Sequence, residues 1–208
     1  MRKNLVEIEF SFFLSKTDGL QSFKDYFPNP SRVKMIQHAI KQLREHKIIG
    51  STHNGLTKIG KHITEIPTMG SIEMTVAMYY GLEEYNCGRD LIRLSAILMS
   101  LINETTIVKD AKAFANKNYG DFYTLLHLMN HCCSMNLQLV NNGGKFKNIV
   151  TRGIGLHEKH VNTIRKAMRR LTQFETFFQK YYPTKYQNSG RYVDVAKSLY
   201  MGFFRNVF

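Results

Sequence analysis

The fold of this chain is decided by residues 55–67, which have the sequence GLTKIGKHITEIP. The first of them completes an Asn-Gly pair, which is a strong signal for a tight turn between two short strands. Thr57 is well suited to cap a helix at its N-terminus, and Pro67 would end that helix. Gly60 inside the helix costs about 1 kcal/mol relative to Ala, which indicates that another part of the backbone comes close to it.

A helix with one apolar side precedes this stretch. Apolar residues recur every three or four positions over residues 32–47, so this segment is predicted to be helical. Residues 48–50 are then predicted to form a short strand that pairs across the Asn-Gly turn. A helix, a small hairpin and a second helix in this order are typical of a winged helix, which we assign to residues 31–68. Residues 1–30 are interpreted as an entry helix and a linker.

Residues 69–208 carry further apolar patterns of helical spacing and predict a multi-helix bundle. Ser71 is predicted to cap its first helix. Residues 91–99 are apolar on nearly all sides, which marks a buried helix, and Arg93 is the one charged residue in it. A short helix is predicted over residues 110–116.

The second half of the bundle is predicted from the same spacing. Asp121 is expected to cap a strongly periodic helix. Residues 137–155 contain several Gly and Asn residues and are interpreted as a loop, with at most a short strand at 146–150. Helices are predicted over residues 157–181 and 192–208. Because the chain ends directly after the last of them, we expect a domain taken from a longer protein.

Composition favours an acidic binding partner. The 208 residues carry a formal net charge of +13 with a pI near 9.7, and 43% of them are hydrophobic, which is enough for a packed core. Nine of the thirteen net positive charges lie between residues 145 and 191. Nucleic acid is therefore the first expected partner and an anionic membrane surface the second. With three cysteines, no apolar span and no signal peptide, we expect an intracellular protein in a reducing compartment.

The sequence contains none of the common catalytic or nucleotide-binding motifs. GxxxxGK[ST], GxGxxG, the nucleophile elbow and HExxH are all absent, so we predict no ATPase activity, no catalytic residues and no cofactor for this segment. Two His and two Cys are close together in sequence at positions 127, 131, 132 and 133. The neighbouring cysteines would project about 100° apart on a helix, and no second Cys pair completes a zinc site, so we expect no metal.

Four basic residues lie close together on the predicted helix at 157–181. They form two like-charged pairs four residues apart, which repel each other by a few tenths of a kcal/mol unless an anion lies between them. This helix side is either solvated or faces RNA, and the RNA-binding candidates from charge are Arg165, Lys166, Arg169, Arg170, Lys145 and Lys147. Tyr119, Phe122 and Tyr123 are candidates for base stacking, although Phe122 is better explained as a core residue.

The order of motifs resembles the C-terminal part of DEAH-box RNA helicases over almost the whole chain. Each motif is weak alone, but five in the right order and spacing are specific. The matching segments are Phe23–Pro30, Ala39–Leu43 with Leu56–Lys61 and Pro67, Cys87–Met99, Gly120–Leu126, and Lys197–Val207. The chain departs from the family pattern at Phe122, where the family has His, and at His127, where it has Asn.

This resemblance implies a mainly α fold, in which a winged helix with a small β-hairpin is followed by a ratchet-like, helicase-associated domain at residues 69–208. In the family, such a module guides single-stranded RNA and lies between two RecA-like motor domains, which hold ATP and Mg²⁺, and an OB-fold. A G-patch protein docks on the winged helix of some members. Since the last motif is most similar to spliceosomal members, the resemblance implies a role in pre-mRNA splicing in the nucleus.

The family motif at residues 120–126 and the residue that follows it add further RNA-binding candidates, namely Asp121, Tyr123, Thr124 and His127. Thr57, Lys58 and Lys61 are candidates for contacts from the winged helix, although capping the helix is sufficient to explain Thr57. The alternative is a free-standing winged-helix protein that binds nucleic acid or acts as a scaffold. Tight, duplex-selective binding through residues 44–61 would favour this alternative.

Overall fold

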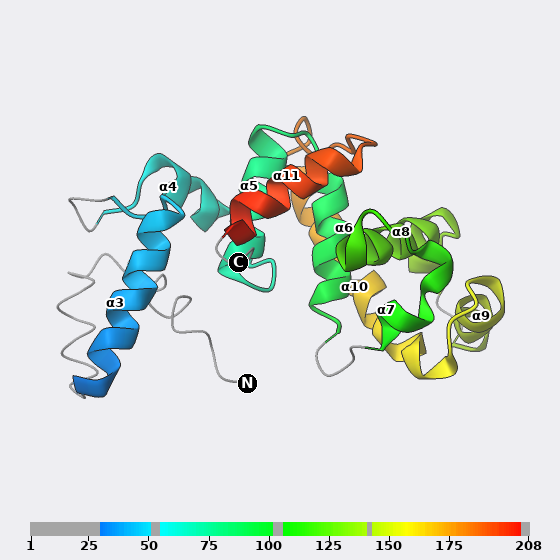
Figure 1. The fold of residues 1–208 in the computed structure, drawn as a ribbon. Helices are drawn as coiled ribbons and strands as arrows, with labels where there is room; N and C mark the ends of the chain where they lie inside the picture. Colours follow the sequence, from blue (N-terminus) through cyan, green and yellow to red (C-terminus); the bar gives the residue numbers. More distant parts are fainter. Residues whose placement is uncertain (1–29, 51–54, 102–105, 141–142, 205–208) are drawn as a thin grey trace. The chain divides into compact units, whose positions relative to one another are not determined.

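The computed structural model describes residues 30–50, 55–101, 106–140 and 143–204 (Figure 1). The entry helix expected near the N-terminus lies outside the described residues. The regular structure in the described part is helical, so the prediction of a mainly α fold with a multi-helix bundle is confirmed. None of the helices in these ranges is long and apolar enough to cross a membrane.

The chain forms two compact units. The first contains residues 1–79 and 201–208, and the second contains residues 80–200. Two helices, α5 (Ile72–Glu83) and α11 (Tyr192–Phe203), are therefore shared between the units. The domain limits expected from sequence, at residues 30/31 and 68/69, stay a prediction.

The first unit begins with α3 (Pro30–Glu45), whose first residue is a proline, as is common at a helix start. Ala39, Ile40 and Leu43 are buried along one side of this helix, as the apolar spacing predicts.

The predicted hairpin is not established in the described residues. A single antiparallel bridge joins Ile49 and Leu56, flanked by two backbone hydrogen bonds of 3.0 Å, one from Gly50 N to Gly55 O and one from Thr57 N to Ile48 O. Since one bridge is not a strand pair, the wing of the expected winged helix is not shown. The Asn of the predicted turn lies outside the described residues.

The helix predicted after this bridge is present as α4 (Lys58–Glu65). Thr57 is its N-cap, and its side-chain oxygen accepts a hydrogen bond of 3.0 Å from Gly60 N. A Cβ atom at Gly60 would lie 2.1 Å from the carbonyl oxygen of Ile48, so the close backbone approach inferred from sequence is confirmed. Ile63 is buried against the same core.

Helix α5 also starts as predicted, because Ser71 Oγ accepts a hydrogen bond of 3.2 Å from Met74 N. Close to the other end of the chain, Gly202 packs against α5. A Cβ atom at Gly202 would lie 2.2 Å from the carbonyl oxygen of Glu73 and 2.9 Å from Cβ of Ala77.

The core of the second unit is built around α6 (Gly88–Leu98), which packs against both α8 (Gly120–Ser134) and α10 (Val161–Tyr181) (Figure 1). Helix α6 is buried along almost its whole length, which confirms the prediction for residues 91–99. Arg93 is 8% exposed, and its Nη1 donates a hydrogen bond of 2.8 Å to Oδ1 of Asn130 on α8.

The segment predicted as one helix over residues 110–116 is divided. Helix α7 (Ile107–Asp110) ends before a separate 3₁₀ turn, η1 (Lys112–Phe114). Asp110 accepts hydrogen bonds from His160 Nε2 at 2.7 Å and from Lys159 at 2.9 Å, which ties the end of α7 to the start of α10.

The interpretation of residues 137–155 as a loop is wrong. They form a 3₁₀ turn, η2 (Leu137–Leu139), then α9 (Gly143–Asn148) and a π-helical turn, η3 (Ile149–Gly153). No strand occurs at residues 146–150, which the structure describes in full. Phe146, Val150 and Ile154 are spaced four residues apart and are all buried, so core packing overrides the weak helix propensity of the glycines.

The last two predicted helices are present with shifted ends. A 3₁₀ turn, η4 (Glu158–His160), precedes α10, and α10 ends before Pro183. Helix α11 carries Val195 and Leu199 in the core. The predicted continuation of α11 to residue 208 extends beyond the described residues.

Candidate functional site

Helix α8 carries a continuous row of rings on its outer side. The prediction that Asp121 caps this helix is wrong, because Tyr119 is the N-cap and Gly120, with a φ of 72°, is the first helical residue. Asp121 is instead an exposed residue of the first turn, where the positive end of the helix dipole stabilises its carboxylate.

Six rings make up this row, which we call the aromatic row: Phe114, Tyr119, Tyr123, His127, His131 and Tyr192. Four of them are spaced four residues apart along the start and length of α8, which places them on one side of the helix. Neighbouring ring centroids are 4.9 to 5.7 Å apart, within the range of favourable aromatic pairs.

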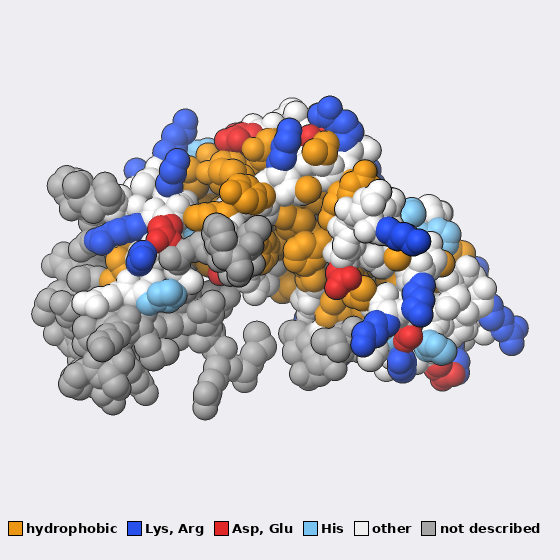
Figure 2. Space-filling view, in the orientation of Figure 1, with side chains coloured by type: hydrophobic (Ala, Val, Ile, Leu, Met, Phe, Trp, Pro, Cys, Tyr) orange, Lys and Arg blue, Asp and Glu red, His pale blue; other side chains and the backbone are white. Residues whose placement is uncertain are grey.

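The row is open to solvent. Tyr119 is 49% exposed and His127 is also exposed, whereas the other four rings are half-buried. Figure 2 shows His side chains (pale blue) at the surface where α8 lies in Figure 1. The segment that leads into α8 adds two exposed lysines, Lys112 and Lys117. Exposed rings beside positive charge can stack unpaired bases and attract their phosphates.

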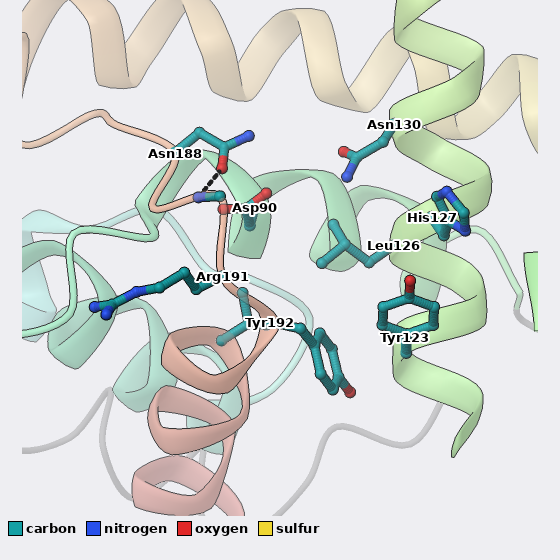
Figure 3. A pocket seen from close by; sticks show the side chains of 10 residues that line it. Asp90, Tyr123, Leu126, His127, Asn130, Asn188, Arg191 and Tyr192 are labelled. Atoms are coloured by element: carbon teal, nitrogen blue, oxygen red, sulfur yellow. Dashed lines mark hydrogen bonds between the residues drawn. The ribbon is translucent and has the colours of Figure 1, made fainter. Parts of the chain in front are cut away.

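A pocket of about 190 Å³ adjoins the row (Figure 3). Leu126 and Asn130 extend from α8 toward Asp90 of α6, and Tyr123 lies next to Tyr192, with ring centroids 4.9 Å apart. The loop that precedes α11 closes the opposite side. Its turn is held by a hydrogen bond of 2.7 Å from Gly190 N to Asn188 Oδ1.

Asp90 is the buried acid of this pocket, with 4% of its surface exposed. Burial raises its pKa to about 6, although the positive charge of Arg93 and a backbone hydrogen bond at Ser189 act in the opposite direction. Arg191 does not neutralise Asp90, because it donates two hydrogen bonds, of 2.9 and 3.3 Å, to Asp194. The pocket therefore holds a carboxylate that is a hydrogen-bond acceptor at neutral pH.

Of the candidates predicted on this helix, Tyr123 and His127 belong to the row and line the pocket, and Asp121 lies at the exposed helix start. Thr124 is buried, and its hydroxyl donates a hydrogen bond of 3.2 Å to the carbonyl oxygen of Gly120. The Thr124 side chain therefore bonds to the backbone of its own helix and does not reach the surface. Phe122 is half-buried.

The four basic candidates on α10 do not form one patch. Arg165 and Arg169 lie about 40° apart around the helix axis and line a second pocket together. Arg170 is about 140° away from Arg165, and its Nη1 donates a hydrogen bond of 2.7 Å to Ser100 Oγ. Lys166 is exposed on the same side as Arg170.

The other two lysine candidates from this region lie on α9. Lys145 is exposed, and Lys147 forms an ion pair of 2.5 Å with Glu158. In the part of Figure 2 where α7 and α9 lie, Lys and Arg side chains alternate with Asp and Glu. The local excess of positive charge is thus partly neutralised at these positions.

The candidates of the first unit lie at the start of α4. Thr57 uses its hydroxyl twice, as the acceptor of the capping hydrogen bond and as a donor to the carbonyl oxygen of Lys47. Lys58 and Lys61 are exposed.

The residues considered for zinc have other roles. Within the described residues, no group of three or more His, Cys, Asp or Glu side chains is arranged to hold a metal ion. The rings of His127 and His131 both pack against Phe114. Cys132 is buried, which raises its pKa to about 12 and keeps the thiol protonated.

Several members of the site are not among the residues predicted from sequence: Asp90, Asn130, Phe114 and Tyr192. The spacing of rings at 119, 123, 127 and 131 could have indicated the row, because it repeats every four residues. No local signal identifies Asp90 or Tyr192, which reach the pocket only through packing of α6 and α11.

No protein-family model matches this sequence, and no curated protein matches it. What the chain binds is therefore inferred from the chemistry of the aromatic row, the pocket beside it and the motifs of the sequence.

Proposed function

We propose that this chain is the non-motor C-terminal module of an ATP-dependent DEAH-box RNA helicase, and that its aromatic row binds single-stranded RNA. The observation that carries RNA binding is the open row of six rings that η1, α8 with its N-cap, and α11 bring together, in a chain with a net charge of +13. Stacking on such rings needs unpaired bases, because bases inside a duplex are covered by their neighbours.

The helicase assignment is supported by the motifs that resemble the family. One of their glycines occupies a position that favours glycine and another a position that requires it. Gly120 begins α8 with a positive φ, and Gly202 lies too close to the backbone of α5 for any side chain. Under this proposal the motor domains of the parent chain hold ATP and Mg²⁺, and an OB-fold completes the RNA path. A G-patch partner and a role in nuclear pre-mRNA splicing belong to the same proposal.

Stacking can be tested with a matched pair of tyrosines. Tyr119 and Tyr181 are 49% and 57% exposed, but only Tyr119 belongs to the row. Loss of one base–ring stack costs about 1–3 kcal/mol, which is roughly a 5- to 150-fold loss of affinity. We expect this loss for Tyr119→Ala in fluorescence anisotropy with a labelled single-stranded RNA, and little change for Tyr181→Ala.

Equal effects of the two substitutions would contradict stacking on the row. A salt series should show affinity falling linearly on a log–log plot, with a slope of about 0.7 per phosphate contact. Preference for duplex, lost on substitution of Lys58 and Lys61, would support the free-standing winged helix instead. The helicase assignment itself predicts ATP-dependent unwinding when the chain is joined to its motor domains.

A further inference from the structure

A second pocket, of about 360 Å³, lies between η2, α9 and α10. Its volume falls within the range of roughly 300–1,000 Å³ that is usual for small-molecule sites. We call it the α10 groove. Its apolar residues are Leu137, Val140, Phe146 and Met168, of which all but Val140 are buried. They form a narrow apolar floor, because most of their surface is already covered by the protein.

Two guanidinium groups border this floor. Arg165 lies over the ring of Phe146, with its Cζ 5.0 Å from the ring centroid, and Arg169 follows one turn later on the same side of α10. Neither forms an ion pair within the described part of the chain. Two like charges one turn apart repel each other unless an anion lies between them. Guanidinium groups bind phosphate through paired hydrogen bonds, so a phosphate is the anion that suits them.

The groove also holds an unused hydrogen-bond acceptor. Oε1 of Gln138 is buried, and it has no hydrogen-bond partner among the described residues. Gln138 as a whole is half-buried, so its side chain must turn toward the groove before a ligand's N–H group can donate to Oε1. A buried acceptor without a donor is unfavourable, so the chain would gain from this pairing. Gln173 and Thr172, also at the groove, can make further hydrogen bonds to the edge of a ring.

We propose that the α10 groove binds a nucleoside phosphate. The phosphate interacts with Arg165 and Arg169, the base lies on the apolar floor, and an amino group of the base donates to Gln138. Two sources share this chemistry, a free mononucleotide and one nucleotide of an RNA strand. The groove and the aromatic row have no residue in common, so this site does not depend on RNA binding by the row.

Calorimetric titration of the full chain with AMP, adenosine and inorganic phosphate tests the proposal. We expect AMP to bind more tightly than either of its parts. Arg169→Glu should weaken AMP binding about tenfold or more, because it removes charge-assisted hydrogen bonds. The matched control is Lys166→Glu, which makes the same change of charge on an exposed residue of the same helix but away from the groove.

A second variant separates binding from folding. Gln138→Met removes the buried acceptor, so the free chain should unfold at a higher temperature while AMP binds more weakly. Equal effects of Arg169→Glu and Lys166→Glu on AMP binding would overturn the proposal, and so would inorganic phosphate that binds as tightly as AMP. The proposal would also fail if AMP does not bind and Arg169→Glu has no effect on RNA binding.

Competition identifies the source of the nucleotide. If a single-stranded RNA displaces AMP, and loses affinity on Arg169→Glu, the groove holds a nucleotide of the strand. If RNA and AMP bind together, the ligand is a free nucleotide. In both cases Tyr119→Ala should leave AMP binding unchanged, so failure of the aromatic row and failure of the groove give different results.

Discussion

Asp90→Asn should stabilise the chain at neutral pH. Burial raises the pKa of Asp90 from 3.8 to about 6 in the folded chain. Because the folded pKa is the higher one, the folded state binds the proton more tightly than the unfolded state between these values. The stabilising contribution of protonated Asp90 is therefore fully present below about pH 4 and is lost as the pH rises through about 6.

The magnitude follows from the two pKa values. They differ by about two, and each pKa unit corresponds to 1.36 kcal/mol, so ionisation of Asp90 lowers the free energy of unfolding by about 3 kcal/mol above pH 6. Asn has nearly the same shape, carries no charge and can still accept the backbone hydrogen bond at Ser189. We expect the variant to be up to about 3 kcal/mol more stable at pH 7 and nearly equal at pH 4.

Urea unfolding followed by circular dichroism, at a series of pH values, measures this difference. Glu84→Gln is the matched control, because Glu84 is an exposed acid on the surface of the same unit, and its effect should stay within about 0.5 kcal/mol. This prediction is contradicted if Asp90→Asn is no more stable than the original chain at neutral pH, or if the difference does not shrink on acidification. In either case burial of an ionised Asp90 does not lower the stability of the folded chain.

Two further variants test other parts of the structure. Asp110→Asn should have the opposite effect on stability, because the hydrogen bonds from His160 and Lys159 lower the pKa of Asp110 to about 2. The substitution should therefore destabilise the chain above about pH 4, and its effect should shrink as the pH falls toward 2. The same unfolding assay measures this difference. Gly60→Ala should lower the melting temperature, because a Cβ atom 2.1 Å from the Ile48 carbonyl oxygen costs about 1–3 kcal/mol, more than the gain of about 1 kcal/mol in helix propensity. A more stable Gly60→Ala variant would contradict the close approach.

Asp90 and the aromatic row also bear on how RNA would be recognised. The carboxylate adjoins the rings for which we propose base stacking, and under this proposal it could help to distinguish one base from another by accepting hydrogen bonds. Asp90→Asn should therefore alter selectivity for bases as well as stability, because an NH₂ donor replaces one of the two acceptor oxygens.

The longer helices and two of the three predicted N-caps were predictable, because they depend on residues close together in sequence. Thr57 and Ser71 cap their helices as expected, since each side chain reaches a backbone N–H three residues later. The failure at residues 137–155 has the opposite origin. Glycines weaken a local helix signal, while Phe146 and Val150 gain more from burial than the glycines cost.

The basic candidates show where charge patterns alone mislead. Arg165, Lys166, Arg169 and Arg170 are neighbours in sequence, but a helix places them on two sides. On one side Arg170 donates a hydrogen bond to Ser100, whereas on the other side Arg165 and Arg169 border the α10 groove. The four basic residues therefore do not form one surface that could face RNA, but lie in two different environments.

The sequence by itself determined the helical class, the longer helices, the caps at Thr57 and Ser71 and the need for glycine at position 60, because these follow from spacing and from contacts within a few residues. Only the tertiary structure decided which side chains share a site. Asp90, Asn130 and Tyr192 come from three helices, and Gln138 faces arginines about thirty residues away in sequence. Burial, pKa and unpaired acceptors depend on such distant neighbours, and no local pattern encodes them.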